Sequence, residues 1–419
     1  MPTPAKSTKY GRSPWVAEYP SSRAPSYPRH RGSLKNNRLD VAIVGGGLTG
    51  CTTAYVFAAA GVNVALIEAD QIGRASSGSS AGWIAGDPGL GFLEIEKALG
   101  RRAARHVWKG WRRAALDFGS LLRRLNVTCD LEPASSLLLA STPQQTTILK
   151  REQKGRRDAG LDASFVDARA VATEVAMTSA GGVRSREGFT FDPYRAAIGL
   201  AAQAVKRKAV LFERTPVRRI TFGRRSVDVF TAGGVIRASR VIVATGMPTA
   251  LFKALRRHFW FRSAFLALTA PIPAKIRKPL GDHATVVRDL ATPAHMVRWM
   301  DDDRLLVSGA DGETPVDRLR GKTIVQRTGQ LMYELSTMYP DISGILPSHG
   351  WDNPYARTAD GLPYIGAHRN YPHHLFAFGD SSPSVTSAYL AARLLLRDFL
   401  DERDPADEAF GFNRYGHVR

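Results

Sequence analysis

The segment from residue 40 to residue 68 constrains the fold more than any other part of the sequence. A short apolar run at 41–44 leads into Gly45-Gly46-Gly47-Leu48-Thr49-Gly50, and a small-residue helix at 48–60 is followed by a second apolar run at 62–67. Strand, glycine turn, helix and strand in this order predict a βαβ unit with parallel strands. Glu68 ends the unit 23 residues after Gly45, which is the spacing of a dinucleotide-binding fingerprint.

Each part of this fingerprint has a physical task. Gly45 permits the tight turn, Gly47 lets the backbone approach a pyrophosphate, and Gly50 lets the helix pack closely on the strand. The first N–H groups of the helix attract phosphate, and Glu68 accepts hydrogen bonds from a ribose. The residues expected to contact a dinucleotide here are Gly45, Gly47, Leu48, Thr49, Gly50 and Glu68.

Further segments carry a resemblance to a known family. A run of small and hydroxyl residues follows Glu68, and the later segments are Val217-Arg218-Arg219-Ile220, a strand ending in Ala244-Thr245-Gly246, Asp360-Gly361-Leu362-Pro363-Tyr364-Ile365-Gly366, and a strand, glycine and helix at 376–400 followed by 405–414. With these segments the sequence resembles the FAD-dependent oxidoreductases of the D-amino-acid oxidase superfamily, which includes glycine, sarcosine and γ-glutamylputrescine oxidases. The resemblance covers residues 39–414, nearly everything except the N-terminal arm.

The resemblance implies FAD as the cofactor. It adds to the expected cofactor contacts Ser76, Ser77, Gly82, Val217, Ala244, Gly246, Gly379 and Thr386. Some relatives attach the flavin covalently through His or Cys. Here Gly82 has no His beside it, and Cys51 and Cys129 lie outside the matching positions, so we expect non-covalent FAD.

The resemblance also implies an α/β fold with discontinuous domains. Residues 39–95, 190–250 and 345–419 are expected to form a Rossmann-like FAD-binding domain, and residues 96–189 and 251–344 an α+β substrate domain with an antiparallel sheet. Residues 1–38 are expected to form a basic, extended arm on the surface, with regular structure beginning near Asp40.

Local patterns predict individual elements. Apolar positions spaced by three and four residues predict an amphipathic helix at 101–125, whose tryptophans Trp108 and Trp111 we expect in the core. Helices are also expected at 144–158 and 193–208, and strands at 210–212, 227–231 and 241–243. Strands at 295–300 and 304–308 would be joined by a hairpin turn of three aspartates.

The reaction that the resemblance implies is oxidation of the C–N bond of an amine or amino acid. Hydride transfer to flavin N5 would give an imine that water hydrolyses, and the electrons would pass to oxygen or another acceptor. Trp351 and Tyr364, which flank the Asp-Gly-Leu-Pro segment, are expected in the substrate pocket, with Arg357 suited to a substrate carboxylate. Other candidates are His258, Arg262, Arg298 and Tyr355.

One segment departs from the family pattern. Many relatives have several glycines before the last helix, where this chain has Gly379-Asp380-Ser381-Ser382-Pro383-Ser384. Cβ atoms and Pro383 restrict close approach to a flavin, whereas Ser381, Ser384 and Thr386 suit helix capping. The departure motivates a second hypothesis, a flavin-binding scaffold with weak or lost catalysis that docks an anionic partner. An NAD-dependent dehydrogenase would fit the glycine turn but leave the later matches unexplained.

Charge and composition bear on partners and location. The net charge is +20, and its excess is concentrated at 1–38 and 101–125, which predicts either an anion-docking surface or a surface kept soluble by its charge. The first 38 residues lack the apolar run of a signal peptide, and no apolar run reaches the length of a membrane span, so we expect a cytoplasmic protein. His368, His373 and His374 lack metal-ligand spacing, so no metal is expected.

Overall fold

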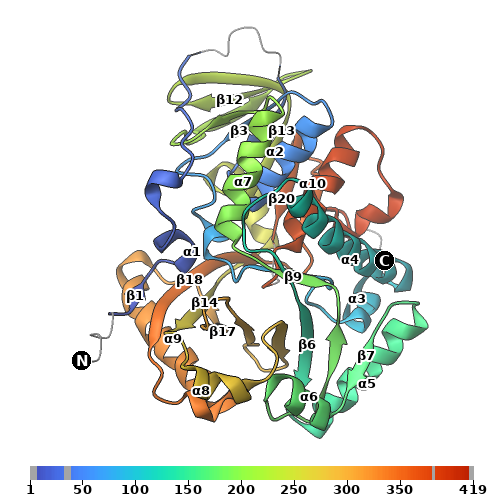
Figure 1. Cartoon of the computed structure of the whole chain (residues 1–419). Coiled ribbons are helices and arrows are strands. Elements are labelled where there is room, and N and C mark those ends of the chain that lie inside the picture. Colours follow the sequence, from blue (N-terminus) through green and yellow to red (C-terminus); the bar gives the residue numbers. More distant parts are fainter. Residues whose placement is uncertain (1–6, 33–38, 380–382, 415–419) are drawn as a thin grey trace.

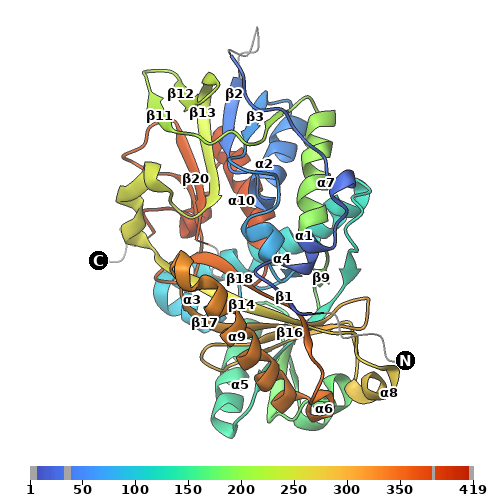
Figure 2. The same ribbon diagram turned by 90° about the vertical axis from the view of Figure 1, so that its left-hand side faces the viewer.

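The βαβ unit expected at 40–68 forms part of an eight-stranded sheet. Strand β2 (Leu39–Val44) leads through the glycine turn into helix α2 (Leu48–Ala59), and β3 (Val64–Ile67) then pairs in parallel with β2. The computed structural model describes residues 7–32, 39–379 and 383–414. Figures 1 and 2 show this sheet at one end of the molecule and a second large sheet at the other.

The eight-stranded sheet is parallel at its centre and antiparallel at one edge. Its continuous order is β10 (Val210–Phe212), β3, β2, β13 (Gly234–Gly246), β12 (Val227–Thr231) and β11 (Arg219–Phe222), and β13 also pairs with β20 (His374–Phe378), which pairs with β19 (Tyr364–Ala367). β11, β12 and β13 form the expected antiparallel meander, and β13 then continues as a buried strand parallel to β2 and β20.

Three helices stack on one another beside this sheet. Helix α2 packs against both α7 (Pro193–Lys206) and α10 (Thr386–Phe399), as Figure 1 shows. Helix α4 (Arg101–Arg124) packs against α10, and its Trp108 and Trp111 are buried. The amphipathic helix and the core position of its tryptophans are therefore confirmed.

The second large sheet is nine-stranded and mostly antiparallel. Its order is β1 (Lys9–Tyr10), β18 (Pro347–Arg357), β14 (Trp260–Thr269), β17 (Leu305–Glu313), β16 (Met296–Trp299), β15 (Thr285–Asp289), β6 (Ser135–Ala140), β8 (Gly181–Ser185) and β7 (Ser164–Val166). Helix α9 (Asp317–Met338) packs on β14, β17 and β18, and α5 (Pro143–Asp158) and α6 (Ala168–Val175) pack on β8 (Figure 2). The fold class expected from the sequence is confirmed.

A small sheet and two further short helices complete the elements used below. The three-stranded sheet consists of β4 (Trp83–Ala85), β9 (Gly188–Thr190) and β5 (Glu132–Pro133), while α3 (Phe92–Leu99) packs on α4 and α8 is Ala274–Arg277. The aspartate turn lies where it was expected, between β16 and β17. Strand β18 was expected with the FAD-binding segments, but it pairs with β14 in the nine-stranded sheet, while the division into domains stays a prediction.

The N-terminal arm corrects one expectation, because regular structure begins well before Asp40. Strand β1 pairs in parallel with β18, and helix α1 (Pro14–Ala17) and a turn of 3₁₀ helix (Ser21–Arg23) follow. The cause is Trp15, which is buried in the main core and donates from Nε1 to the Ser80 carbonyl oxygen at 2.9 Å. One buried aromatic side chain fixes a segment whose polar composition predicts an extended surface chain.

No helix in the described part of the chain combines the length and the apolarity needed to cross a membrane.

Candidate cofactor and substrate site

The expected cofactor residues meet at one edge of the eight-stranded sheet. Gly45 follows β2, Glu68 follows β3, Ala244 and Gly246 end β13, and Gly379 follows β20. Because these strands run parallel to one another, their carboxyl ends lie side by side. Ligands of open α/β sheets bind at this edge, so the topology brings together residues that are far apart in sequence.

The glycine turn has the geometry that its fingerprint predicts. Gly45 has φ of 108°, and a Cβ atom there would lie 2.6 Å from the Ala244 carbonyl oxygen. A Cβ on Gly50 would lie only 1.8 Å from the Gly45 carbonyl oxygen, so glycine alone permits this contact between helix and turn. Gly47 is the N-cap of α2, and Gly45, Gly47 and Thr49 are partly exposed while the residues between them are buried.

Glu68 is held beside this turn. Its Oε2 accepts a hydrogen bond from the Gly46 N–H at 2.6 Å, and its Oε1 accepts one from the Asp70 N–H at 2.8 Å. Burial raises the pKa of the carboxyl, while these backbone hydrogen bonds act in the opposite direction. A carboxylate oxygen accepts more than one hydrogen bond, so a ribose hydroxyl is chemically compatible with this arrangement.

The run of small and hydroxyl residues that follows Glu68, which we call the serine run, connects the glycine turn to the other large sheet. Ser77 Oγ accepts a hydrogen bond from the Leu48 N–H at 2.7 Å and so caps α2 from outside the helix. Ser76 Oγ donates to the Pro354 carbonyl oxygen of β18 at 3.2 Å. Gly82 has φ of 66°, and a Cβ there would meet the Phe191 carbonyl oxygen at 2.3 Å.

At the other end of the site, Thr386 connects the start of α10 to β4. Its Oγ1 accepts from the Ala85 N–H at 2.9 Å and donates to the Ala85 carbonyl oxygen at 2.8 Å, and Ser384 Oγ lies 2.8 Å away. The N-cap residue of α10 is Val385, which makes no side-chain cap hydrogen bond, and Ser384 Oγ, one residue before it, accepts from the Thr386 N–H at 3.2 Å. Ser381, the other expected cap, lies outside the described residues.

The residues at the nucleotide end fit an adenine dinucleotide. The partly exposed glycines of the turn have no Cβ to fill the space where a pyrophosphate would approach, and the helix start carries a partial positive charge. Val217 precedes β11, and its backbone N–H makes no hydrogen bond within the described residues, so it is available to an adenine edge. Gly379 has φ of 84°, and a Cβ there would meet Thr358 and Phe259. Both the backbone conformation and the packing therefore require glycine at this position.

The three residues expected around a substrate do not come together. Trp351 is buried in the main core and donates from Nε1 to the Ser79 carbonyl oxygen at 2.9 Å, which places it against the serine run. Tyr364 is buried in a different core cluster, where it stacks on Phe412 with ring centroids 4.8 Å apart. Arg357 is exposed at the end of β18. The structure therefore does not support a single pocket that contains Trp351, Tyr364 and Arg357.

Arg414 has a role that sequence reasoning missed. Its guanidinium makes two charge-assisted hydrogen bonds to Asp360, of 2.6 and 2.7 Å, and one of 2.9 Å to the Leu362 carbonyl oxygen. It also covers the ring of Tyr364, with 3.6 Å between Cζ and the ring centroid. The closing Arg at this position of the matched C-terminal pattern was the available signal, and its function is to fix the Asp-Gly-Leu-Pro segment.

The basic helix α4 is partly neutralised. Arg112 pairs with Glu187 at 2.5 Å, Arg113 pairs with Asp117 at 2.8 Å, and Arg101 donates to the Asp158 carbonyl oxygen. Within the described residues, no group of three His, Cys, Asp or Glu side chains is arranged to hold a metal ion.

Comparisons with known proteins place this geometry in a family. The family model described as FAD dependent oxidoreductase matches residues 40–397. The chain belongs to this family of FAD-dependent oxidoreductases. The chain is therefore that of an FAD-dependent enzyme, and its family model covers the glycine turn, the serine run and the start of α10.

Individual relatives are distant but match over most of their length. The γ-glutamylputrescine oxidoreductase of Escherichia coli is 25% identical over 364 residues, covering 85% of this chain and 82% of that protein. A glycine oxidase of Bacillus licheniformis is 25% identical over 355 residues, covering 82% and 88%. The crystal structure of glycine oxidase from Geobacillus kaustophilus has a TM-score of 0.74 at 21% identity and covers 90% of this chain and 98% of that chain. The last comparison supports the fold.

Proposed function

We propose that this FAD-dependent oxidoreductase oxidises the C–N bond of an amine or an amino acid. The observation that carries the proposal is the match, over more than four fifths of the chain, to relatives named for such substrates, γ-glutamylputrescine and glycine. The C–H bond next to nitrogen gives up a hydride and the nitrogen a proton, and the resulting imine reacts with water to give a carbonyl compound and ammonia, or an amine where the nitrogen carries a second carbon group.

FAD, when bound, would supply the acceptor for this hydride at its N5, with oxygen or another compound as the final electron acceptor. The protein's own residues bind and orient. The start of α2 and the glycine turn would hold the pyrophosphate, and Glu68 would accept hydrogen bonds from the ribose. Thr386 and Ser384 fix the position of β4 relative to α10 near the ring end. Trp351, packed on the serine run, fixes β18 against that run.

The competing chemistry is oxidation of a C–O bond on the same fold. The solved structure of an L-α-glycerophosphate oxidase from Mycoplasma pneumoniae has a TM-score of 0.69 with this chain at 17% identity. Matched substrate pairs separate the two reactions, because glycine and glycolate, or alanine and lactate, differ only in the heteroatom at the oxidised carbon.

The test is anaerobic stopped-flow mixing of the FAD-loaded enzyme with these pairs and with a panel of other amines. We expect at least one amine or amino acid to bleach the oxidised flavin band while its hydroxy analogue does not. Bleaching by the hydroxy acids alone would contradict the proposal. If no amine bleaches the flavin and the protein instead binds anionic vesicles or nucleic acid in a steeply salt-dependent way, the scaffold hypothesis replaces it.

A further inference from the structure

The N-terminal arm lies outside the part of the chain that the family model matches, yet the structure fixes it at both ends. The family match begins at residue 40, and the described part of the arm is residues 7–32. At one end β1 pairs with β18 of the nine-stranded sheet. At the other end the Tyr27 N–H donates to Glu213 Oε2 at 3.1 Å, directly after β10 of the eight-stranded sheet. Figures 1 and 2 show the arm, in dark blue, running from one large sheet to the other.

Between its two ends the arm holds the backbone of the serine run. Ser13 Oγ donates a hydrogen bond to the Gly78 carbonyl oxygen, and Trp15 Nε1 donates one to the Ser80 carbonyl oxygen at 2.9 Å. Ser13 and Trp15 are 2% and 7% exposed, and Gly78 and Ser80 are buried as well. Because these groups are shielded from solvent, water is a poor replacement for either donor.

Strand β18 holds the same run beside the arm. Trp351 Nε1 donates to the Ser79 carbonyl oxygen, which lies between the two carbonyl groups that the arm binds. Trp351 follows Gly350, and Gly350 is the residue of β18 that pairs with Tyr10 of β1. Three consecutive carbonyl groups of the serine run therefore receive side-chain donors from outside the run, two from the arm and one from the strand to which the arm is paired.

Further hydrogen bonds lead from Ser80 to the start of α2. Ser80 Oγ donates to the Ser77 carbonyl oxygen at 3.0 Å, and Ser77 Oγ accepts from the Leu48 N–H at 2.7 Å. Leu48 begins the helix at whose N-terminus the pyrophosphate of FAD is expected. A continuous series of hydrogen bonds thus connects Trp15 in the arm with the expected phosphate site.

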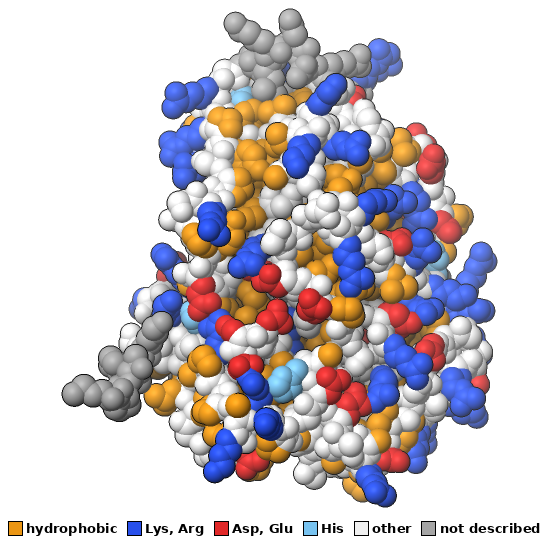
Figure 3. All heavy atoms as spheres, viewed as in Figure 1, with side chains coloured by type: hydrophobic (Ala, Val, Ile, Leu, Met, Phe, Trp, Pro, Cys, Tyr) orange, Lys and Arg blue, Asp and Glu red, His pale blue; other side chains and the backbone are white. Residues whose placement is uncertain are grey.

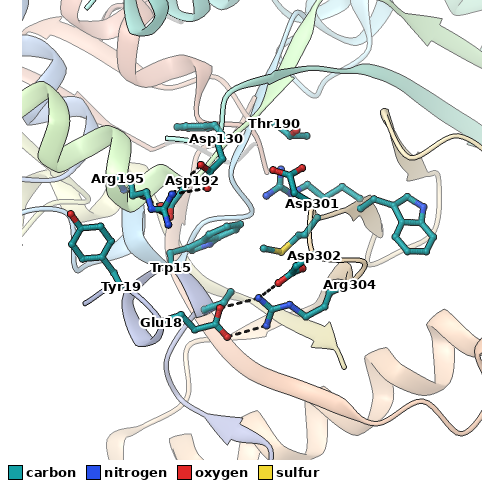
Figure 4. Close-up of a pocket in the computed structure, with 15 residues that line it drawn as sticks. Trp15, Glu18, Tyr19, Asp130, Thr190, Asp192, Arg195, Asp301, Asp302 and Arg304 are labelled. Atoms are coloured by element: carbon teal, nitrogen blue, oxygen red, sulfur yellow. Dashed lines mark hydrogen bonds and ion pairs between the residues drawn. The ribbon is translucent and has the colours of Figure 1, made fainter. Parts of the chain in front are cut away.

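A salt bridge fixes α1 next to these contacts. Both carboxylate oxygens of Glu18, which follows α1, accept hydrogen bonds from Arg304, at 3.0 and 2.9 Å, and Figure 4 shows this pair close to Trp15. Arg304 also pairs with Asp302. Acidic side chains gather near the level of α1 and β1 in Figure 3, whereas the charged residues of the arm other than Glu18 are Lys and Arg. Opposite charges therefore favour the docked position of the arm.

We propose that the arm is a clamp on the cofactor site, in which Trp15 is a positioning residue that holds the serine run against α2 and so raises the affinity for FAD. The family model does not include the arm, so the family match does not assign this role. The inference rests on the expected contact of FAD with the serine run and the start of α2, and it does not depend on the proposed reaction. Because coupling between two sites is reciprocal, bound FAD should in turn stabilise the docked arm.

Two matched tryptophan variants test the clamp. Trp15→Phe keeps a buried aromatic ring and removes the Nε1 donor. Trp299→Phe is the control, because Trp299 is 6% exposed and its Nε1 makes no hydrogen bond within the described residues. The FAD-loaded proteins are diluted in series, and the fluorescence of the released flavin gives the Kd for FAD. We expect Trp15→Phe to raise this Kd by about tenfold, since a buried carbonyl oxygen loses its donor, and Trp299→Phe to leave it nearly unchanged.

Limited trypsin digestion of the wild-type protein tests the reciprocal effect. The peptide bond after Arg23 lies in the arm, and the bond after Arg225 lies in the exposed turn between β11 and β12. FAD should slow cleavage after Arg23 several-fold and leave cleavage after Arg225 unchanged. In Trp15→Phe the protection of the arm by FAD should be clearly smaller.

The outcomes separate a positioning role from a structural one. A lower Tm of Trp15→Phe with an unchanged Kd for FAD would show that Trp15 serves only the stability of the fold, and would overturn the proposal. Equal protection of both peptide bonds by FAD would overturn it as well. If Trp15→Phe does not fold, Ser13→Ala, which removes the other donor to the serine run, gives the same comparison of Kd. None of these measurements requires turnover, so a failure to oxidise amines would leave the clamp to be judged on its own.

Discussion

Single residues decide how closely the backbone segments of the site approach one another. Gly50 lies in a helix, where alanine is normally the better residue, yet its Cα faces the Gly45 carbonyl oxygen so closely that no Cβ fits. Gly329 also lies in a helix, α9, and has no neighbouring atom within 4 Å of a Cβ position. The two glycines share a helical backbone and differ only in their surroundings.

Gly50→Ala and Gly329→Ala should therefore change stability in opposite directions. We expect Gly50→Ala to cost about 1–3 kcal/mol of unfolding free energy through overpacking, and to reduce bound FAD. Gly329→Ala should add about 0.5–1 kcal/mol, because it removes conformational freedom from the unfolded chain. Denaturant melts and the ratio of flavin to protein absorbance check both; equal effects of the two variants would refute this explanation.

His295 is a residue whose contribution depends on pH. Its Nδ1 lies 2.7 Å from Asp289 and its Nε2 lies 3.0 Å from Glu334, and the hydrogen bond to Asp289 is the largest cause of its raised pKa. A pKa raised in the folded state means that the stabilisation is fully present below the unfolded pKa near 6.5 and is lost as pH rises through the folded value.

His295→Gln should consequently destabilise the protein more at acidic than at alkaline pH. We expect a loss of about 1–2 kcal/mol at pH 6, because charged hydrogen bonds to two carboxylates disappear, and a clearly smaller loss at pH 9. Tm measured for both proteins across this range is the test, with His373→Gln, a partly exposed histidine that bonds to Arg240 and to no carboxylate in the described residues, as the control. A difference in Tm that does not change with pH would show that His295 is neutral throughout.

At the scale of elements, the start of α10 and β4 depend on one another. The helix has no glycine-rich entry here, and two hydroxyl side chains instead accept hydrogen bonds from the Ala85 N–H of β4. The Val385 N–H also donates to the Trp83 carbonyl oxygen at 2.9 Å. The segment that departs from the family pattern therefore leads into a helix start that is hydrogen-bonded to β4.

Thr386→Val preserves the shape of the side chain and removes its hydroxyl. We expect a loss of about 1–3 kcal/mol, because the buried Ala85 carbonyl oxygen loses its donor, together with weaker FAD retention. Thr386→Ser keeps the hydroxyl and should retain most of the stability. Urea unfolding and flavin fluorescence distinguish them, and identical behaviour of the two variants would mean that the hydroxyl is unimportant.

At the scale of the whole molecule, the cofactor and the charge are the properties that matter. The family is FAD-dependent, while the mode of attachment remains our prediction. Both cysteines of the chain, Cys51 and Cys129, are buried in the structure, and burial raises the pKa of each thiol. A thiol with a raised pKa is a poor nucleophile, which favours non-covalent FAD.

Acid precipitation should therefore release the flavin into the supernatant and leave a colourless pellet. Adding FAD back to apoprotein prepared under milder conditions should raise its stability by about 2.7 kcal/mol at a free concentration one hundred times Kd, because the ligand binds only the folded state. NAD at the same concentration is the control. A yellow pellet would contradict non-covalent binding.

The sequence alone determined the nucleotide end of the site. The order of Gly45, Gly50 and Glu68 predicts their geometry because it is created within one local βαβ unit, and the later family segments predict the remaining strands of the same sheet. The spacing of apolar positions by three and four residues at 101–125 likewise predicts a buried face, since this spacing places them on one side of a helix.

Only the tertiary structure decided what lies around a substrate. Trp351 and Tyr364 are close to the same motif in sequence but belong to different core clusters, and Arg298 becomes an unpaired buried cation only because the arm, β16 and the small-residue run meet there. Trp15 orders the arm because it packs into a core whose other residues lie far from it in the sequence. The physical reason is that burial and charge pairing depend on every element packed around a side chain, which local pattern and spacing do not specify.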